Sequence, residues 1–151
     1  MASLLALVAL SGALAPASVR AADRPVKIVV FGDSLSAGFG LPANAAFPAR
    51  LAAALRDKNI AAEIANAGVS GDTASGGMGR VDWSVPDGTD AVILELGAND
   101  ALRGIDPKVT KAALDVTLRK LGERRIAVLL AGMVAPPNMG ADYAQAFNAI
   151  F

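Results

Sequence analysis

The sequence has 151 residues and a mass of 15.2 kDa, the size of one ordinary domain. Hydrophobic residues make up 54% of the chain and charged residues 19%, so the chain can bury a core and is not expected to be disordered. Lys plus Arg and Asp plus Glu number 14 each, and this balance argues against a nucleic-acid partner because it creates no field that attracts a polyanion. Cys and His are both absent, which excludes thiolate chemistry, cysteine metal sites and an imidazole base supplied by this chain.

The first 22 residues have the pattern of a secretory signal peptide. The apolar run at 4–14 is too short to span a bilayer and has the length of a signal core. Pro16 follows it, and cleavage is predicted after Ala21 or Ala22. A buried N-terminal helix is the alternative, because no Lys or Arg precedes the apolar run. No other stretch has the roughly 18 apolar residues of a membrane span, so we expect an exported protein with no stable membrane span.

From residue 23 onward the sequence alternates strand and helix patterns. Short, apolar, mostly β-branched runs predict strands at 26–31, 60–65, 91–96 and 126–131. Apolar residues at helical spacing predict helices at 47–58, 73–85, 107–121 and 141–151. Asp106 and Pro107 are expected to start the third helix, and Gly122 is expected to lie just past its end. The sole tryptophan, Trp83, is expected to pack the second helix.

Alternating strands and helices predict an α/β domain with a parallel sheet covered on both sides. Residues 23–151 contain no repeat, low-complexity tract or linker, so one domain is expected. The last predicted helix runs into the end of the sequence with Ile150 and Phe151 still apolar. We therefore expect a domain that is incomplete at its C-terminus, with the last strand and helix missing.

Three polar loops follow the first three predicted strands. They are residues 32–36 (Gly-Asp-Ser-Leu-Ser), 68–73 (Gly-Val-Ser-Gly-Asp-Thr) and 97–100 (Gly-Ala-Asn-Asp). In open parallel sheets, ligands bind at the carboxyl ends of the strands, where these loops are expected to lie. Each loop alone is more often a turn and a helix cap. One such loop at each of three successive strand ends favours a catalytic site.

The residue types in these loops suit acyl transfer. Ser34 is placed at a strand-to-helix turn, where backbone amides favour a developing anion. Gly71 lets a backbone N–H approach a ligand, and Asn99 offers an amide donor that does not titrate. Fixed donors around a nucleophile stabilise the tetrahedral oxyanion, by about 3–4 kcal/mol each.

These motifs together resemble the sequence blocks of the GDSL, or SGNH, hydrolases, at residues 31–38, 66–73 and 95–100. Residues 102–104, 136, 138 and 143–148 are similar to one branch, which contains exported bacterial arylesterases and thioesterase–lysophospholipases. The resemblance covers residues 26–151. It implies a flavodoxin-like three-layer α/β/α sandwich, a small acyl-ester, thioester or lysophospholipid substrate, and no metal or organic cofactor.

By the same resemblance Ser34 is the nucleophile, and Ser34 N–H, Gly71 N–H and the Asn99 side chain form the oxyanion hole. The fourth block of the family, Asp-x-x-His, has no counterpart because the sequence contains no His. Asp142 has the spacing of that block but Gln145 stands where His belongs, so Asp142 is predicted to be only a helix cap. The resemblance therefore implies a carboxylic-ester or thioester hydrolase whose 151-residue chain, lacking its base, is inactive or nearly so.

Two other functions are weighed against hydrolysis. One is a catalytically dead module that retains the pocket and binds acyl or lipid ligands. The other is a flavodoxin-like phosphate or nucleotide binder, which is disfavoured because the loops lack Gly-x-x-x-x-Gly-Lys and Gly-x-Gly-x-x-Gly. Leu102, Val134 and Pro136 are candidates to line the substrate groove, and nothing in the pattern indicates an oligomeric state.

Overall fold

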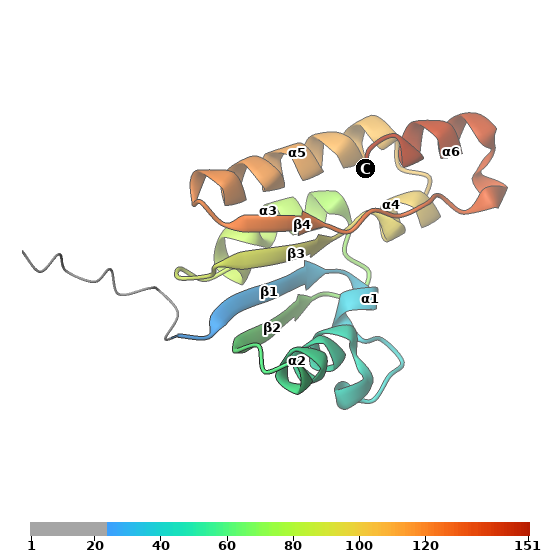
Figure 1. Ribbon diagram of the computed structural model, residues 1–151. Helices are drawn as coiled ribbons and strands as arrows, with labels where there is room; N and C mark the ends of the chain where they lie inside the picture. The colour runs from blue at the N-terminus through green and yellow to red at the C-terminus, as the bar shows by residue number, and fades with distance from the viewer. Residues whose placement is uncertain (1–23) are drawn as a thin grey trace, which may run out of the picture.

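The computed structural model describes residues 24–151, so the predicted signal peptide at 1–22 lies outside the described residues. The sheet consists of β1 (Val26–Gly32), β2 (Ala62–Gly68), β3 (Ala91–Glu95) and β4 (Ala127–Leu130), in the order β2-β1-β3-β4, with every pairing parallel (Figure 1). The helices are α1 (Ser34–Ala37), α2 (Phe47–Asp57), α3 (Ala74–Ser84), α4 (Ala98–Leu102), α5 (Pro107–Glu123) and α6 (Ala141–Asn148), with short 3₁₀ turns at Ala43–Ala45 and Pro137–Met139. The predicted α/β class with a parallel sheet is confirmed.

The two central strands carry the most deeply buried residues of the sheet. In β1, Val30 and Phe31 are fully buried, and in β3 so are Val92 and Leu94. A strand that is buried on both faces needs apolar side chains on both, as at the end of β1. In β3 alternate residues are fully buried and the residues between them are half-buried. The core therefore runs through β1 and β3, and their carboxyl ends are the best-fixed points for a site.

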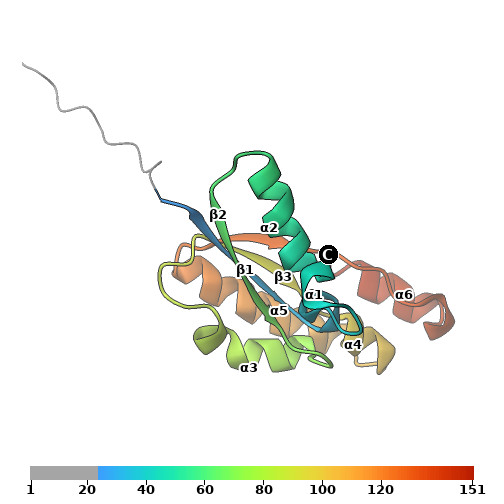
Figure 2. The same cartoon turned by 90° about the horizontal axis from the view of Figure 1, so that it is seen from below.

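Helices lie on both sides of the sheet, so the fold has three layers. In Figure 2, α3 and α5 lie on one side and α2 lies on the other. On the first side, Val81 of α3 and Leu114 and Leu121 of α5 pack against the sheet in one hydrophobic core. The apolar residues at helical spacing in α5 thus form its buried face.

The second strand begins and ends later than its pattern predicts. Asn59 has a φ of +56°, and the Ile60 N–H still bonds to the Leu55 carbonyl at the end of α2. The parallel register with β1 then pairs Ala62 with Val26 and continues to Gly68 opposite Gly32. Pairing with the neighbouring strand sets these limits, so the local pattern alone placed the strand two to three residues too early.

Three local expectations are wrong. Gly122 does not follow α5 but lies inside its last turn, because Arg125 takes up the left-handed conformation, with a φ of +57°. Asp142 does not cap α6: Gly140 holds the N-cap position, and no side-chain capping bond is made there. Trp83 does not pack inward but is 74% exposed, since the buried face of α3 is formed by other positions, among them Arg80.

Within residues 24–151 there is no helix with the length and apolarity needed to cross a membrane. The same part of the chain contains no cluster of three or more acidic side chains arranged to hold a metal ion.

Candidate functional site

The three predicted loops meet at the carboxyl end of the sheet. Ser34 opens α1 directly after β1, Gly71 follows β2, and Asn99 lies in α4 directly after β3. Because β2, β1 and β3 are neighbours and parallel, the loops that follow them lie at the same end of the sheet (Figure 1). The topology thus brings together residues that are up to 65 positions apart in the sequence.

The Asn99 side chain connects the other two loops. Its Nδ2 donates to Oδ2 of Asp33, 3.1 Å away, and to the backbone carbonyl of Asp72, 2.9 Å away. An uncharged amide donor therefore lies between the Ser34 turn and the Gly71 loop. A fixed, uncharged N–H donor is a group that can stabilise an oxyanion.

The turn that presents Ser34 is fixed by Asp33. The Asp33 side chain is fully buried, and its Oδ1 accepts a hydrogen bond from the Leu35 N–H at 3.0 Å, which caps α1. The Asp33 carbonyl accepts from the Ala37 N–H at 2.9 Å. Ser34 itself is half-buried, so its hydroxyl stands on a rigid turn with access to solvent.

Gly71 is required by its backbone conformation and not by lack of space. Its φ is +84°, and a Cβ there would meet its nearest neighbour, Nη2 of Arg103, at 3.6 Å, an ordinary contact distance. The tight turn is closed by a 3.1 Å bond from the Asp72 N–H to the Val69 carbonyl. From outside, Arg103 Nη2 donates to the Gly71 carbonyl at 2.8 Å, which orients that peptide.

A buried arginine, which the sequence analysis did not identify, supports the loops from behind. Arg80 Nε lies 2.6 Å from Oδ2 of Asp72, and the side chains of this pair are only 8% and 12% exposed. The guanidinium also donates to the carbonyls of Gly32 and Ala67, both at 2.9 Å, and it lies 4.1 Å from the centre of the Phe31 ring. One side chain thus ties together the ends of β1 and β2 and the start of α3.

Asp100, next to Asn99, has a structural role in the described residues. It is fully buried, and its two carboxylate oxygens accept from the Ala74 N–H at 2.8 Å and from the Thr110 hydroxyl at 3.0 Å. These bonds fix the first turns of α3 and α5 relative to α4. Asp100 therefore positions the helix that carries Asn99.

Glu95 lies under the Ser34 turn, at the end of β3. Its Oε2 accepts from the Ser36 hydroxyl at 2.8 Å and from the Asp33 N–H at 3.3 Å. Burial, together with the nearby charge of Asp33, raises the pKa of Glu95 above its ordinary value. Oε1 of Glu95 is buried and has no hydrogen-bond partner among the described residues.

Residues 143–148, which carried part of the resemblance, anchor α6 beside these loops. The Tyr143 hydroxyl donates to the Ile105 carbonyl at 2.9 Å, and Asn148 accepts from the Ala135 N–H at 2.8 Å. Phe147 is fully buried next to Ala101 and Ala135. Asp142 is exposed. Of the three groove candidates, Leu102 and Val134 are 69% and 77% exposed and Pro136 is half-buried, so none of them is packed into the core.

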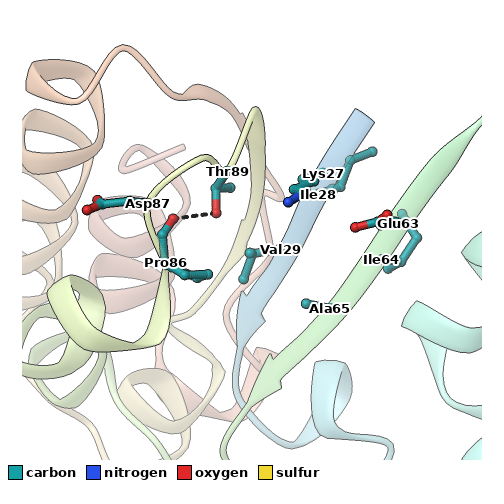
Figure 3. Close-up of a pocket in the computed structure, with 9 residues that line it drawn as sticks. All are labelled: Lys27, Ile28, Val29, Glu63, Ile64, Ala65, Pro86, Asp87 and Thr89. Carbon is teal, nitrogen blue, oxygen red and sulfur yellow. Dashed lines mark hydrogen bonds between the residues drawn. The ribbon is translucent and has the colours of Figure 1, made fainter. Parts of the chain in front are cut away.

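A hollow of about 430 Å³ lies at the other end of the strands (Figure 3). It is lined from β1 and β2 by residues such as Lys27 and Glu63, and by the loop before β3, where the Thr89 hydroxyl donates to the Pro86 carbonyl at 2.8 Å. It includes none of Ser34, Gly71 and Asn99. This hollow is therefore separate from the candidate site.

The sequence and the fold both match one family of hydrolases. Residues 30–151 match the model of the GDSL-like lipase/acylhydrolase family. An arylesterase of Vibrio mimicus is 36% identical over 126 residues, covering 83% of this chain and 63% of that protein. A thioesterase 1/protease 1/lysophospholipase L1 of Escherichia coli is 36% identical over 125 residues, covering 82% of this chain and 59% of that protein. The chain belongs to the GDSL-like lipase/acylhydrolase family.

Solved structures agree with this assignment. The crystal structure of AlinE4, an SGNH-hydrolase family esterase, superposes with a TM-score of 0.81 at 46% sequence identity. The match covers 84% of this chain and 69% of the AlinE4 chain. The chain thus spans roughly three fifths of the two curated relatives and about two thirds of the solved one.

Proposed function

We propose that this chain carries the nucleophile, Ser34, and the oxyanion donors of a serine hydrolase of carboxylic esters or thioesters. The observation that carries the proposal is the Asn99 amide, which bonds to Asp33 at 3.1 Å and to the Asp72 carbonyl at 2.9 Å. This amide is a donor that does not titrate, and it lies between the turn that carries Ser34 and the Gly71 loop. The arylesterase and thioesterase/lysophospholipase names of the relatives support small acyl esters, thioesters or lysophospholipids as the substrate class.

The proposed reaction has two halves. Ser34 Oγ attacks the carbonyl carbon and gives its proton to a base, and the carbonyl oxygen becomes an anion held by Ser34 N–H, Gly71 N–H and Asn99 Nδ2. The bond from the carbonyl carbon to the leaving oxygen or sulfur then breaks, and the leaving group takes up a proton. Water next attacks the acyl-Ser34 ester, releasing the carboxylic acid and restoring the hydroxyl.

Asn99 must exchange one of its present hydrogen bonds to stabilise the oxyanion. We propose that the oxyanion replaces Asp33 Oδ2 as the acceptor, since Asp33 remains fixed by the bond from Leu35 N–H to its Oδ1. The bond to the Asp72 carbonyl then continues to aim the amide.

The base is the part of the reaction that this chain does not supply. The sequence contains no His, and loss of the serine or histidine of a catalytic triad lowers turnover by about 10⁶-fold in the best-studied case. We therefore propose that the chain by itself is inactive or nearly so, and that added imidazole accelerates acylation of Ser34.

An active-site titration with p-nitrophenyl butyrate tests both parts. We expect p-nitrophenolate release above the background rate that imidazole gives without protein, together with a butyryl mass increase on Ser34. Imidazole should accelerate both, and Ser34→Ala should show neither. Asn99→Ala is expected to slow acylation by about 10²–10³-fold. Release that is equal in Ser34→Ala contradicts the proposed nucleophile, and sustained turnover without imidazole contradicts the proposed inactivity. Ligand binding without any acyl adduct favours the acyl- or lipid-binding module instead.

We further propose that residues 1–22 direct export. The support is the apolar run at 4–14 followed by small residues before Asp23. Expression in a bacterial host should yield an exported product, and its mass should be that of a chain that begins at Ala22 or Asp23. Leu7→Arg, which interrupts the apolar run, should leave the full-length chain in the cytoplasm, and export of that variant would contradict the proposal.

A further inference from the structure

The helix α4 holds the loop between β2 and α3 at two consecutive carbonyl groups. Nδ2 of Asn99 donates to the carbonyl of Asp72 at 2.9 Å. Nη2 of Arg103, the residue that ends α4, donates to the carbonyl of Gly71 at 2.8 Å. Residues four positions apart lie one above the other on the same side of a helix, so Asn99 and Arg103 reach the loop from one side of α4. The loop is therefore held at two points and not by Asn99 alone.

The helix is the fixed partner in this contact. The buried Asp100 carboxylate bonds to the first turns of α3 and α5, and Ala101 is only 2% exposed. The Arg103 N–H bonds to the Asn99 carbonyl at 3.1 Å and closes the end of α4. Because α4 is tied to the core in this way, the exposed Arg103 side chain extends from a rigid base.

Gly71, in contrast, has few restraints of its own. Glycine reaches backbone conformations that other residues avoid, and the φ of +84° at Gly71 is one of them. Within residues 24–151 the Gly71 N–H makes no hydrogen bond. The peptide between Gly71 and Asp72 is held by the bond from Arg103 to its carbonyl and by the 3.1 Å bond from its N–H to the Val69 carbonyl. Without Arg103, only the longer of these two bonds would remain.

We propose that Arg103 is a positioning residue for the oxyanion donor at Gly71. The proposal rests on the proposed function in one point, namely that the Gly71 N–H receives the oxyanion. A fixed carbonyl limits rotation about both backbone bonds of Gly71, so its N–H keeps one direction. A donor that is aimed before the reaction stabilises an oxyanion most, because no reorganisation is needed as the charge develops. Arg103 acts through Gly71 and needs no contact with the substrate.

The first measurement is the backbone amide signal of Gly71 in the ¹⁵N-labelled full chain. The wild type should give one sharp signal. Arg103→Met removes the donor and keeps an unbranched apolar stem, and it should broaden or split the Gly71 signal through microsecond-to-millisecond exchange, measured by relaxation dispersion. Arg119→Met, which removes a like charge from an exposed residue of α5, should leave the Gly71 signal unchanged. Both side chains are exposed, so neither variant should unfold the chain, and Tm checks this.

The second measurement is the imidazole-assisted acylation of Ser34 by p-nitrophenyl butyrate. Arg103→Met should lower the rate at saturating ester by about tenfold, less than the 10²–10³-fold expected when a donor itself is lost. The ester concentration that gives half of the maximal rate should change by less than about twofold, because the contact with Gly71 matters after the ester is bound. Arg119→Met should match the wild type in both quantities.

Three results would overturn the proposal: an unchanged Gly71 signal in Arg103→Met, an unchanged acylation rate in that variant, or equal effects of Arg103→Met and Arg119→Met. A lower rate with an unchanged Gly71 signal would assign Arg103 to a charge effect. Failure of the proposed function looks different. In that case the wild type forms no acyl-Ser34, while Arg103→Met still alters the Gly71 signal.

Discussion

The two ends of the sheet differ in whether their charged groups are buried or exposed. At the carboxyl end, Asp33 and Asp100 are fully buried and Arg80 is 7% exposed, and each makes several hydrogen bonds. At the amino end, the ion pair between Arg24 and Asp90 lies on the surface, with side chains 58% and 31% exposed. The charges at the carboxyl end cost desolvation energy and must be paired, whereas those at the amino end remain largely solvated.

This difference shows where the fold requires precise geometry. Bonds to the buried or half-buried side chains of Asp33, Asp72 and Asn99 hold the loops at the carboxyl end. At the hollow of the amino end (Figure 3), the bond from the Thr89 hydroxyl to the Pro86 carbonyl is exposed.

The largest expected effect is at Arg80. Arg80→Met should lower the free energy of unfolding by about 3–5 kcal/mol, because it leaves Asp72 buried without its partner and removes the donors to Gly32 and Ala67. Lys120→Met, which breaks an exposed pair with Asp82, should change it by about 1 kcal/mol or less. Denaturant unfolding of both variants checks this, and equal effects would remove the distinction between buried and exposed pairs.

A smaller, pH-dependent effect is expected at Glu95. Its folded pKa is raised, so in the unfolded state Glu95 ionises at a lower pH than in the folded state. Its contribution to stability is complete below the ordinary pKa of 4.5 and is lost as the pH rises through the folded pKa. Glu95→Gln should therefore become more stable relative to the wild type as the pH rises from 4 to 8. A pH-independent difference in thermal unfolding would show that Glu95 does not titrate in this way.

The smallest effect is expected at Asp90, and its dependence on pH is opposite to that of Glu95. Its bonds to Arg24 and to the Lys27 N–H lower its pKa from 3.8 to about 2. Its contribution is present above the ordinary pKa and is lost as the pH falls through about 2. Asp90→Asn should be slightly less stable than the wild type at neutral pH, with a difference that shrinks in high salt and vanishes at the acid limit. A difference that persists in molar salt would contradict a solvated pair.

Much of the fold and of the candidate site could be predicted from local sequence. The runs of apolar residues located β1 and β3, because β1 is buried on both faces at its end and β3 has one fully buried face. Asp106 and Pro107 predicted the start of α5, since capping depends on neighbouring residues; the Asp106 side chain indeed accepts from the Lys108 N–H at 2.9 Å. The loops with Ser34, Gly71 and Asn99 could be found because each directly follows a predicted strand.

The errors came where distant contacts decide the outcome. The limits of β2 follow from its register against β1, and the exposure of Trp83 follows from which face of α3 meets the sheet. Gly122 was misjudged because the helix end depends on Arg125 accepting a positive φ. Arg80 gave no local signal, since the three groups that it ties together, in Asp72, Ala67 and Gly32, lie 8, 13 and 48 residues away in the sequence.

The sequence by itself determined the alternation of strands and helices, the family, and the identity of the candidate nucleophile and amide donor, because these depend on neighbouring residues and on short motifs. Only the tertiary structure decided which groups hold the candidate nucleophile and the amide donor in place. It placed Asn99 between two other loops, buried Arg80 against Asp72, and left Leu129 of β4 exposed in a hollow that Glu95 also lines. The physical reason is that burial and hydrogen bonding between segments far apart along the chain are set by how the helices pack on the sheet, which no local pattern encodes.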